Sequence, residues 1–442
     1  MSRSRRFYGL FAAGVGLALL LQAVPRMEQG LAEIHWDLDV DLLTARAFLA
    51  HYNPFTPEGA VRSGLAASGP AGNGHPPTTS FWFLPLAQMD SRTAGAALAW
   101  VSVLVLLLQL AATLNLLRCP APLVSAWLGL TFILGCSFLK YHLAVGQSSA
   151  LIGFLYFVGW YAGRTGKTSD DWLAGAALGA ACTFKMFPGL MMVPFLLAFR
   201  WRVLVGGAAV YLTVAAIMTA GFGLSSWPLF MAQQAPIANL WMDSVQNQSI
   251  HGIVLRLFTP VCVPHRPVLM AATLISITVS LMFIAGAIWL VRRTVRAGGF
   301  DLAYALFVVL SVVTSQWTWE HYTVIYVLPV LLLGNELVGR WRVRQQRRAV
   351  GALLFILTAV VASWRIDMET KRHLQLLVHQ GSRQQHLLLH LYDVLNWAPA
   401  LVLLAMLAVV CRWKKRELAS SAVGSRTAQK AGPVIAVQLP VQ

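Results

Sequence analysis

Apolar runs long enough to cross a membrane recur along this chain, and they decide its fold class. Hydrophobic residues make up 57% of the 442 positions and charged residues only 12%. A soluble protein of this length needs more polar surface to cover its core. A run of about 20 apolar residues spans the hydrocarbon as a helix, which satisfies its own backbone hydrogen bonds. The sequence therefore predicts an all-α, polytopic transmembrane protein.

The hydrophobic pattern predicts about twelve spans. They are 7–24, 92–116, 121–139, 148–163, 172–184, 188–199, 203–221, 268–291, 301–315, 322–337, 349–364 and 396–411. The first is long for a signal peptide and no small-x-small cleavage site follows it, so we expect a retained anchor. The short fifth and sixth spans are separated at Lys185-Met186-Phe187-Pro188, where proline disrupts the preceding turn. One long helix broken at this point is the alternative.

The positive charge of the chain is distributed unevenly between the two sides of this arrangement. Alternating the spans from a cytoplasmic N-terminus places the whole net charge of +17 on the cytoplasmic side, as the positive-inside rule expects. The charge thus indicates topology, and we expect no nucleic-acid partner. The sequence predicts a plasma-membrane protein with both termini in the cytoplasm. We expect one integral membrane domain over residues 1–417 and a disordered cytoplasmic tail over 418–442.

The long connections of this arrangement all lie on the outer side. They are residues 25–91, 222–267 and 365–395. The chemistry is therefore expected on the outer face. Residues 38–50 have the pattern of a helix lying along the membrane interface, whereas residues 57–75 are rich in Gly, Ala and Ser and are expected to form a mobile loop.

Three of the 17 acidic residues fall within five positions, at Asp37, Asp39 and Asp41. In a helix, Asp37 and Asp41 share a face and Asp39 points elsewhere. A carboxylate whose pKa is raised by partial burial can accept a proton from a hydroxyl nucleophile. The segment is thus a candidate catalytic base, and a solvated acidic loop is the alternative.

Further polar candidates stand at the predicted outer ends of spans. Lys185 is a candidate for holding a lipid phosphate, although a lysine at a membrane boundary can also snorkel. Glu320 and His321 follow Trp317 and Trp319, and contact with a phosphate or a sugar is as plausible as an aromatic belt containing one ion pair. Gln147, Asn247 and Gln248 carry amides that suit sugar hydroxyls, but amides also cap helices.

The sequence gives little reason to expect a metal or another cofactor. His386 and His390 have helical spacing within a group of four histidines over 373–390, but no carboxylate or cysteine completes a zinc site. The five cysteines lack metal-ligand spacing. No phosphate-cradling glycine loop, nucleophilic-serine motif or zinc-protease motif is present. The energy for bond formation would therefore have to come from an activated substrate.

Six short motifs, taken in order over about residues 37–335, resemble the glycosyltransferase 87 family of the GT-C superfamily. They are Asp37-Leu38 through Asn53-Pro54-Phe55, His75-Pro76-Pro77 with Leu84-Pro85-Leu86, Gly146-Gln147, Ala174-Gly175 with Gly179 and Lys185-Met186-Phe187-Pro188, Asn247-Gln248-Ser249, and Trp319-Glu320-His321. The chain departs from the family pattern at two places. Asp41-Leu42 replaces the aromatic pair that often follows the first Asp, and Ser315-Gln316 replaces the Ser-Pro that often precedes the Trp-Glu-His element. These departures put the identities of acceptor and sugar in doubt more than the type of reaction.

The resemblance implies a transferase that takes a sugar from a polyprenyl phosphate and passes it to a lipid or glycan acceptor. Asp37 would be the general base of one inverting displacement, with Asp39 and Asp41 as alternatives. Lys185 and His321 would hold the donor phosphate, with no metal required. Glu320, Gln147, Gln248, Asn247 and His75 would contact substrate. Mannose is the leading candidate sugar and arabinofuranose the other.

Two other functions compete with this interpretation. A transporter or lipid flippase would place polar residues and broken helices near the bilayer midplane, whereas this chain gathers its polar residues at the outer boundary. A ligase or polymerase that moves whole lipid-linked glycans would need a larger and more basic outer cavity. The transferase therefore remains the first hypothesis.

Overall fold

The computed structural model describes residues 36–67, 73–117, 133, 137–241, 244, 247–258, 270–296, 298–341, 347–363 and 398–417. Within these ranges the regular structure is helical and no strand occurs. This confirms the predicted all-α class. The predicted first span at 7–24, the histidines over 373–390 and the tail over 418–442 lie outside the described residues.

The helices follow the apolar runs of the sequence closely. In chain order they are α2 Trp36–Leu49, α3 Pro57–Ser63, η1 Leu65–Ala67, η2 Pro77–Leu86, α4 Ser91–Leu116, α6 Ser137–Val145, α7 Ser149–Thr165, α8 Thr168–Phe184, η3 Phe187–Met192, α9 Val193–Leu197, α10 Trp201–Phe222, α11 Ser226–Trp241, α12 Ile250–Phe258, α13 Met270–Val291, α14 Phe300–Val313, η4 Glu320–Tyr326, α15 Val327–Trp341, α16 Arg347–Ser363 and a last helix at 398–417.

Four of the described helices are long and apolar enough to cross a membrane. They are Ser91–Leu116, Trp201–Phe222, Met270–Val291 and Glu320–Trp341, and a fifth is obtained if α6 and α7, bent by 114°, count as one span. The protein is thus a multi-pass membrane protein, but the count of about twelve spans is not confirmed. The predicted span 7–24 and most of the span 121–139 lie outside the described residues, and others, such as α8 and α14, form helices of only 17 and 14 residues.

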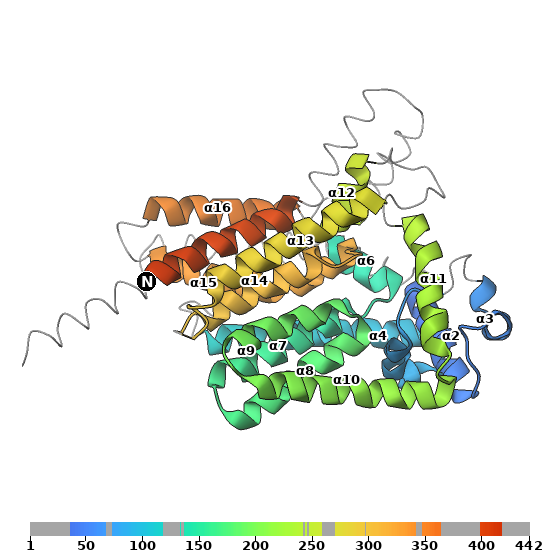
Figure 1. Ribbon diagram of the computed structural model, residues 1–442. Coiled ribbons are helices and arrows are strands. Elements are labelled where there is room, and N and C mark those ends of the chain that lie inside the picture. Colours follow the sequence, from blue (N-terminus) through green and yellow to red (C-terminus); the bar gives the residue numbers. More distant parts are fainter. Residues whose placement is uncertain are drawn as a thin grey trace, which may run out of the picture.

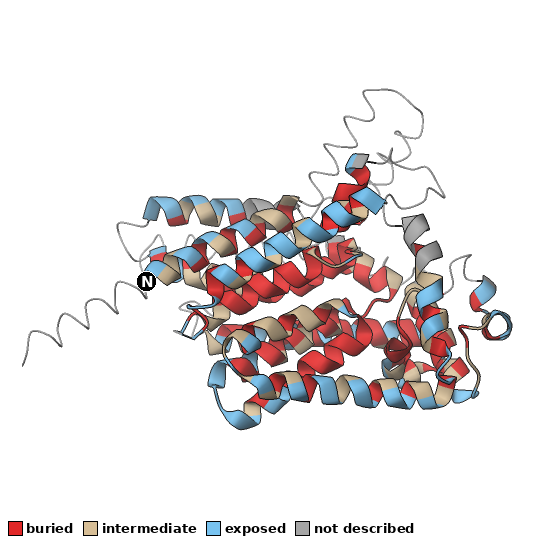
Figure 2. Ribbon diagram, viewed as in Figure 1, coloured by how far each residue is buried: buried red, intermediate tan, exposed pale blue. Residues whose placement is uncertain are grey.

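The long helices run side by side, and shorter elements lie across one end of them. Figure 1 shows α7, α8, α10, α13 and α14 extended in one direction, with α2, α3 and α11 grouped at one end. The centre of the packing is α14, which is buried from Leu302 to Val313 (Figure 2). Helix α2 packs on η2 and contacts α4 and α10. This end of the bundle therefore holds the three carboxylates.

The segment after α2 is more ordered than its composition suggests. The expectation of a mobile loop over residues 57–75 is wrong for 57–67, which form α3 and η1. Thr56 caps α3 by accepting a hydrogen bond from the backbone N–H of Gly59, and Pro57 occupies the first turn. These two features are strong helix-start signals, and they outweigh the small residues that follow.

Helices α8 and α10 pack unusually closely because glycines face each other between them. A Cβ at Gly179 would lie 2.3 Å from the carbonyl oxygen of Gly207, and one at Gly175 would lie 2.5 Å from that of Val203. Small residues at such positions let membrane helices approach to backbone contact. This contact thus holds α8, which ends immediately before Lys185, firmly against α10.

We expect Gly179→Ala to destabilise the protein, because the added methyl group meets backbone rather than a movable side chain. Overpacking of this kind costs about 1–3 kcal/mol. The measurement is thermal unfolding of the purified protein in detergent. Gly286→Ala in α13 is the matched control, since no atom of the described residues lies within 4 Å of its Cβ position. Equal melting temperatures for the two variants would contradict the close packing of α8 on α10.

Candidate active site

The three carboxylates of α2 divide between two directions, as their spacing predicts. Asp37 and Asp41 lie one helical turn apart, and their carboxylates accept hydrogen bonds from Gln147 Nε2 and from His75 Nδ1 respectively. Asp39 instead accepts a hydrogen bond from the hydroxyl of Ser91 at the start of α4. Asp37 and Asp41 therefore face one shared site, and Asp39 lies outside it.

Gln147 is placed in this site by a sharp bend in the chain. Gly146 adopts a positive φ of 71°, a conformation that glycine accepts without steric cost. The bend of 114° between α6 and α7 occurs here. Gln147, directly after it, donates through Nε2 to Asp37, and its Oε1 accepts a hydrogen bond of 2.9 Å from Lys185 Nζ. One amide thus connects a carboxylate with an ammonium group.

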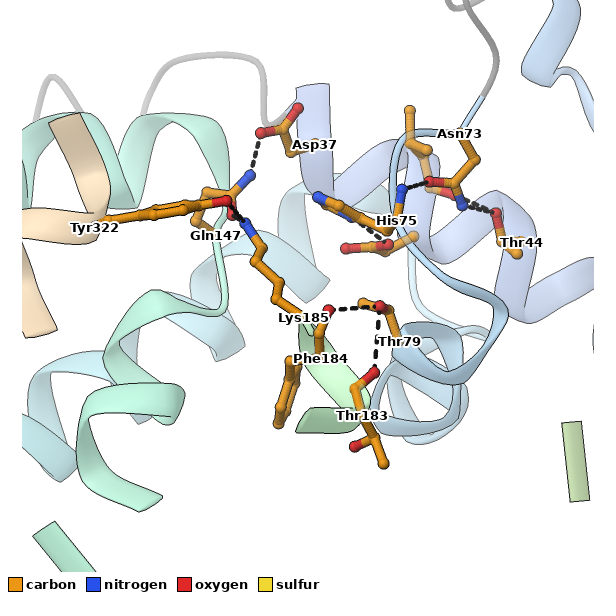
Figure 3. Close-up of polar contacts among 12 residues, drawn as sticks. Asp37, Thr44, Asn73, His75, Thr79, Gln147, Thr183, Phe184, Lys185 and Tyr322 are labelled. Carbon is orange, nitrogen blue, oxygen red and sulfur yellow. Dashed lines mark hydrogen bonds and ion pairs between the residues drawn. The ribbon is translucent and has the colours of Figure 1, made fainter. Parts of the chain in front are cut away.

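Lys185 lies at the break between α8 and η3, where the sequence predicts an interruption. Its backbone is extended, and its side chain is buried. Nζ donates to Gln147 and, over 2.6 Å, to the hydroxyl of Tyr322, whose ring centre is 4.2 Å away. Figure 3 shows Lys185 directed between Gln147 and Tyr322. This inward position disfavours the snorkelling interpretation.

Element η2 secures the end of α8 next to Lys185. The hydroxyl of Thr79 donates over 2.8 Å to the carbonyl of Phe184. The indole N–H of Trp82 donates over 2.6 Å to the hydroxyl of Thr183, and its ring stacks on that of Phe184. Figure 3 shows Thr79 bonded to the end of α8. Together, the contacts of Thr79 and Trp82 fix the end of α8 from the side of η2.

Burial and neighbouring charges shift the pKa values of Asp37 and Lys185. Burial raises the pKa of Asp37, and the neighbouring His75 and Lys185 oppose that rise. Burial lowers the pKa of Lys185 to about 8, while Asp37 and Asp41 act in the opposite direction. A carboxyl with a raised pKa is a stronger base than one in water, which suits proton abstraction.

The Trp-Glu-His element opens η4 and lies next to Lys185. Glu320 and His321 are both buried. The His321 ring contacts Tyr322 and Tyr141, with ring centres 4.7 Å and 5.6 Å away, and its two nitrogens have no hydrogen-bond partner within the part of the chain that the structure describes. A buried imidazole with free hydrogen-bonding capacity beside an ammonium group is suited to a polar ligand.

The predicted amide residues Asn247 and Gln248 do not join this cluster by any described side-chain contact. Oδ1 of Asn247 accepts hydrogen bonds from the backbone N–H groups of Ser249 and Thr318, and the backbone N–H of Gln248 donates to the carbonyl of Thr318. These bonds hold the segments before α12 and before η4 together, whereas α12 is capped by Ser249, whose hydroxyl accepts a hydrogen bond from the backbone N–H of Gly252. Asn247 thus has a structural role, and substrate contact by Asn247 or Gln248 stays a prediction.

Sequence reasoning missed Tyr322 and Asn73. Tyr322 directly follows the Trp-Glu-His element, so its position was a usable signal, but its bond to Lys185 joins residues 137 positions apart. Asn73 accepts a hydrogen bond of 2.7 Å from the backbone N–H of His75 and donates over 2.8 Å to the hydroxyl of Thr44. No local pattern marked Asn73.

Comparison with known proteins decides the family of this chain. Residues 74–315, more than half of the chain, match Glycosyltransferase family 87. The chain belongs to this family. The matched range contains His75, Gln147 and Lys185, whereas the carboxylates of α2 precede it. The protein is thus a membrane glycosyltransferase, and the resemblance seen in the sequence motifs is confirmed.

One curated relative is the polyprenol-phosphate-mannose-dependent alpha-(1-2)-phosphatidylinositol mannoside mannosyltransferase of Mycobacterium tuberculosis (strain ATCC 25618 / H37Rv). It is 25% identical to this chain over 307 residues, which cover 66% of this chain and 67% of the relative. No solved structure matches the chain. Within the described residues, no three or more His, Cys, Asp or Glu side chains gather as a candidate metal site.

Proposed function

We propose that this glycosyltransferase moves a mannosyl unit from a polyprenyl-phosphate mannose to a lipid or glycan acceptor on the outer face of the plasma membrane. The observation that carries the proposal is the continuous chain of contacts from Asp37 through Gln147 to Lys185 and Tyr322. It brings a carboxylate and an ammonium group together within one site, which supports the roles of base and phosphate-binding cation. The dependence of the mycobacterial relative on polyprenol-phosphate-mannose supports this donor.

Lys185 is the group that receives the donor phosphate. An ammonium group has three N–H donors, and the described partners of Lys185, Gln147 and Tyr322, take two of them. The third is available for a phosphate oxygen. The positive charge then stabilises the polyprenyl phosphate as it leaves the sugar, which lowers the barrier at the point where negative charge develops. His321, beside Tyr322, contributes its ring nitrogens to binding of the same phosphate.

Asp37 is the general base that activates the acceptor hydroxyl. Gln147 fixes its carboxylate, and burial makes it a stronger base. The hydroxyl oxygen attacks the anomeric carbon from the side opposite to the phosphate, so the configuration inverts in one displacement. The leaving group is already a stable phosphate monoester, so neither a nucleotide nor a cofactor enters the scheme. We assign Glu320 and Gln147 to contact with the sugar or the acceptor.

The outer-face location rests on charge distribution and on the position of the site. Alternating spans put the excess of basic residues on the cytoplasmic side. The end of the bundle that carries α2 then corresponds to the opposite side (Figure 1). A donor whose polyprenyl tail lies in the membrane can present its phosphate at this level, close to Lys185.

Sugar transfer by the purified full-length protein in nanodiscs tests the proposal. Labelled polyprenyl-phosphate mannose and polyprenyl-phosphate arabinofuranose are offered separately, with a membrane-lipid extract as acceptor. We expect a mannosylated lipid whose mass identifies the acceptor. Product from the arabinofuranose donor alone would correct the sugar. No product with either donor, from protein that binds neither, would contradict the proposal.

A further inference from the structure

The imidazole of His75 is held against one carboxylate of α2 and acts electrostatically on the other. Its Nδ1 lies 2.9 Å from Oδ1 of Asp41, whose side chain is only 4% exposed. Together with Lys185, His75 opposes the rise that burial causes in the pKa of Asp37. In Figure 3 the His75 ring extends toward the space beside Asp37 and Gln147. His75 thus lies between the two carboxylates that face the site.

A closed set of hydrogen bonds fixes the segment that carries His75 onto α2. The backbone N–H of His75 donates to Asn73 Oδ1, and Asn73 Nδ2 donates to the hydroxyl of Thr44 over 2.8 Å. Thr44 in turn donates to the carbonyl of Val40, one turn earlier in α2. Because Asp41 also belongs to α2, His75 is anchored to α2 through both its backbone and its imidazole ring. This leaves the imidazole little freedom to rotate away.

The contact with Asp41 determines which nitrogen of the neutral ring carries the proton. A carboxylate can only accept, so Nδ1 of His75 is the protonated nitrogen and Nε2 keeps its lone pair. Within the described residues, Nε2 has no hydrogen-bond partner. An oriented imidazole with a free acceptor nitrogen is the arrangement by which enzymes take up a proton during reaction.

We propose that His75, oriented by Asp41, is the proton relay of this centre and takes from Asp37 the proton that Asp37 removes from the acceptor hydroxyl. This inference rests on the proposed function. The O–H bond of the acceptor breaks as its oxygen bonds to the anomeric carbon, and the bond from that carbon to the phosphate oxygen breaks with its electron pair. The proton passes to Asp37 and then to His75 Nε2, directly or through one water.

Charge balance explains why such a relay is useful here. In the described site, His75 contacts the carboxylate of Asp41, and both His75 and the ammonium group of Lys185 act on the carboxylate of Asp37, so two carboxylates face one ammonium group. After the transfer, the protonated ring of His75 is stabilised by the carboxylate of Asp41 and by Asp37, which has become ionised again. This restores the base for the next turnover without releasing the proton into the apolar part of the protein. Asp41 and Asn73 are positioning residues in this scheme.

The test is chemical rescue of His75→Ala in nanodiscs with the mannose donor and the full-length protein. We expect kcat to fall about 10²-fold, with KM for donor and acceptor within twofold of wild type. Added imidazole should restore kcat in a saturable manner. Asn73→Ala, which loosens the segment but keeps the ring, should lose activity without responding to imidazole. His51→Asn is the control for removal of a histidine, since His51 is exposed and its positive φ suits asparagine.

Each outcome decides the question. An unchanged kcat in His75→Ala would overturn the relay. So would a loss of kcat, in folded protein, that imidazole does not restore. The variant Asp37→Asn tests the general base separately. If the alanine variant does not fold, His75→Gln serves with a proton inventory in mixed H₂O and D₂O. A bowed plot in wild type that becomes linear in His75→Gln supports the relay, and identical plots overturn it. An inactive wild type would overturn the proposed function and the relay together.

Discussion

Replacing Asp37 by Asn is expected to lower kcat for sugar transfer by about 10²–10⁴-fold, the usual contribution of a positioned general base. The amide is nearly the same size as the carboxylate and can still contact Gln147, so the site should keep its shape. What it loses is the ability to take the proton of the acceptor hydroxyl. The measurement is steady-state transfer from labelled polyprenyl-phosphate mannose in nanodiscs, together with donor affinity, which should change little.

Asp39→Asn is the matched comparison for this variant. Asp39 belongs to the same helix but accepts a hydrogen bond from Ser91, away from Gln147 and Lys185. We expect it to retain most of the transfer activity. A full loss in Asp39→Asn with normal activity in Asp37→Asn would move the base to the other face of α2 and refute the assignment made from the structure.

The second large effect is expected at Lys185, where the dependence of transfer on pH should reveal the buried ammonium group. The charged form binds the donor phosphate, so kcat/KM for the donor should fall as the pH rises through the Lys185 pKa of about 8. On the acid side the ionised form of Asp37 is needed. Its pKa is raised, so activity should decline on acidification from above pH ~4, the ordinary carboxyl value.

Two variants separate these limbs of the profile. Lys185→Arg keeps a positive charge at all accessible pH values, and the alkaline decline should disappear. Lys185→Met removes a charge-assisted hydrogen bond worth about 1.5–3 kcal/mol, and kcat/KM for the donor should fall about tenfold to a hundredfold at neutral pH. The groups that act electrostatically together with Lys185 are Asp37, Asp41, His142 and His321. An alkaline limb that persists in Lys185→Arg would assign it to one of the other groups.

The sequence alone determined the helical class, most helix positions and the family of this protein. Hydrophobic periodicity acts over a few neighbouring residues, so α4, α10 and α13 begin and end close to their predicted limits. The interruption at Lys185 was also readable, because Pro188 acts on the turn before it. The division of Asp37, Asp39 and Asp41 followed from helix geometry in the same local way.

Only the tertiary structure decided which polar groups meet. Gln147 reaches Asp37 across 110 positions, and His75 reaches Asp41 across 34. The same long-range packing brings Asn247 Oδ1 to the backbone N–H of Thr318, 71 positions away, so its amide holds the segment before η4. The partner that a side chain takes depends on how helices distant in sequence pack against each other. The close backbone approach of Gly179 to Gly207 is one contact that sets this packing. Hydrophobic pattern fixes each helix locally and leaves those contacts to the assembled bundle.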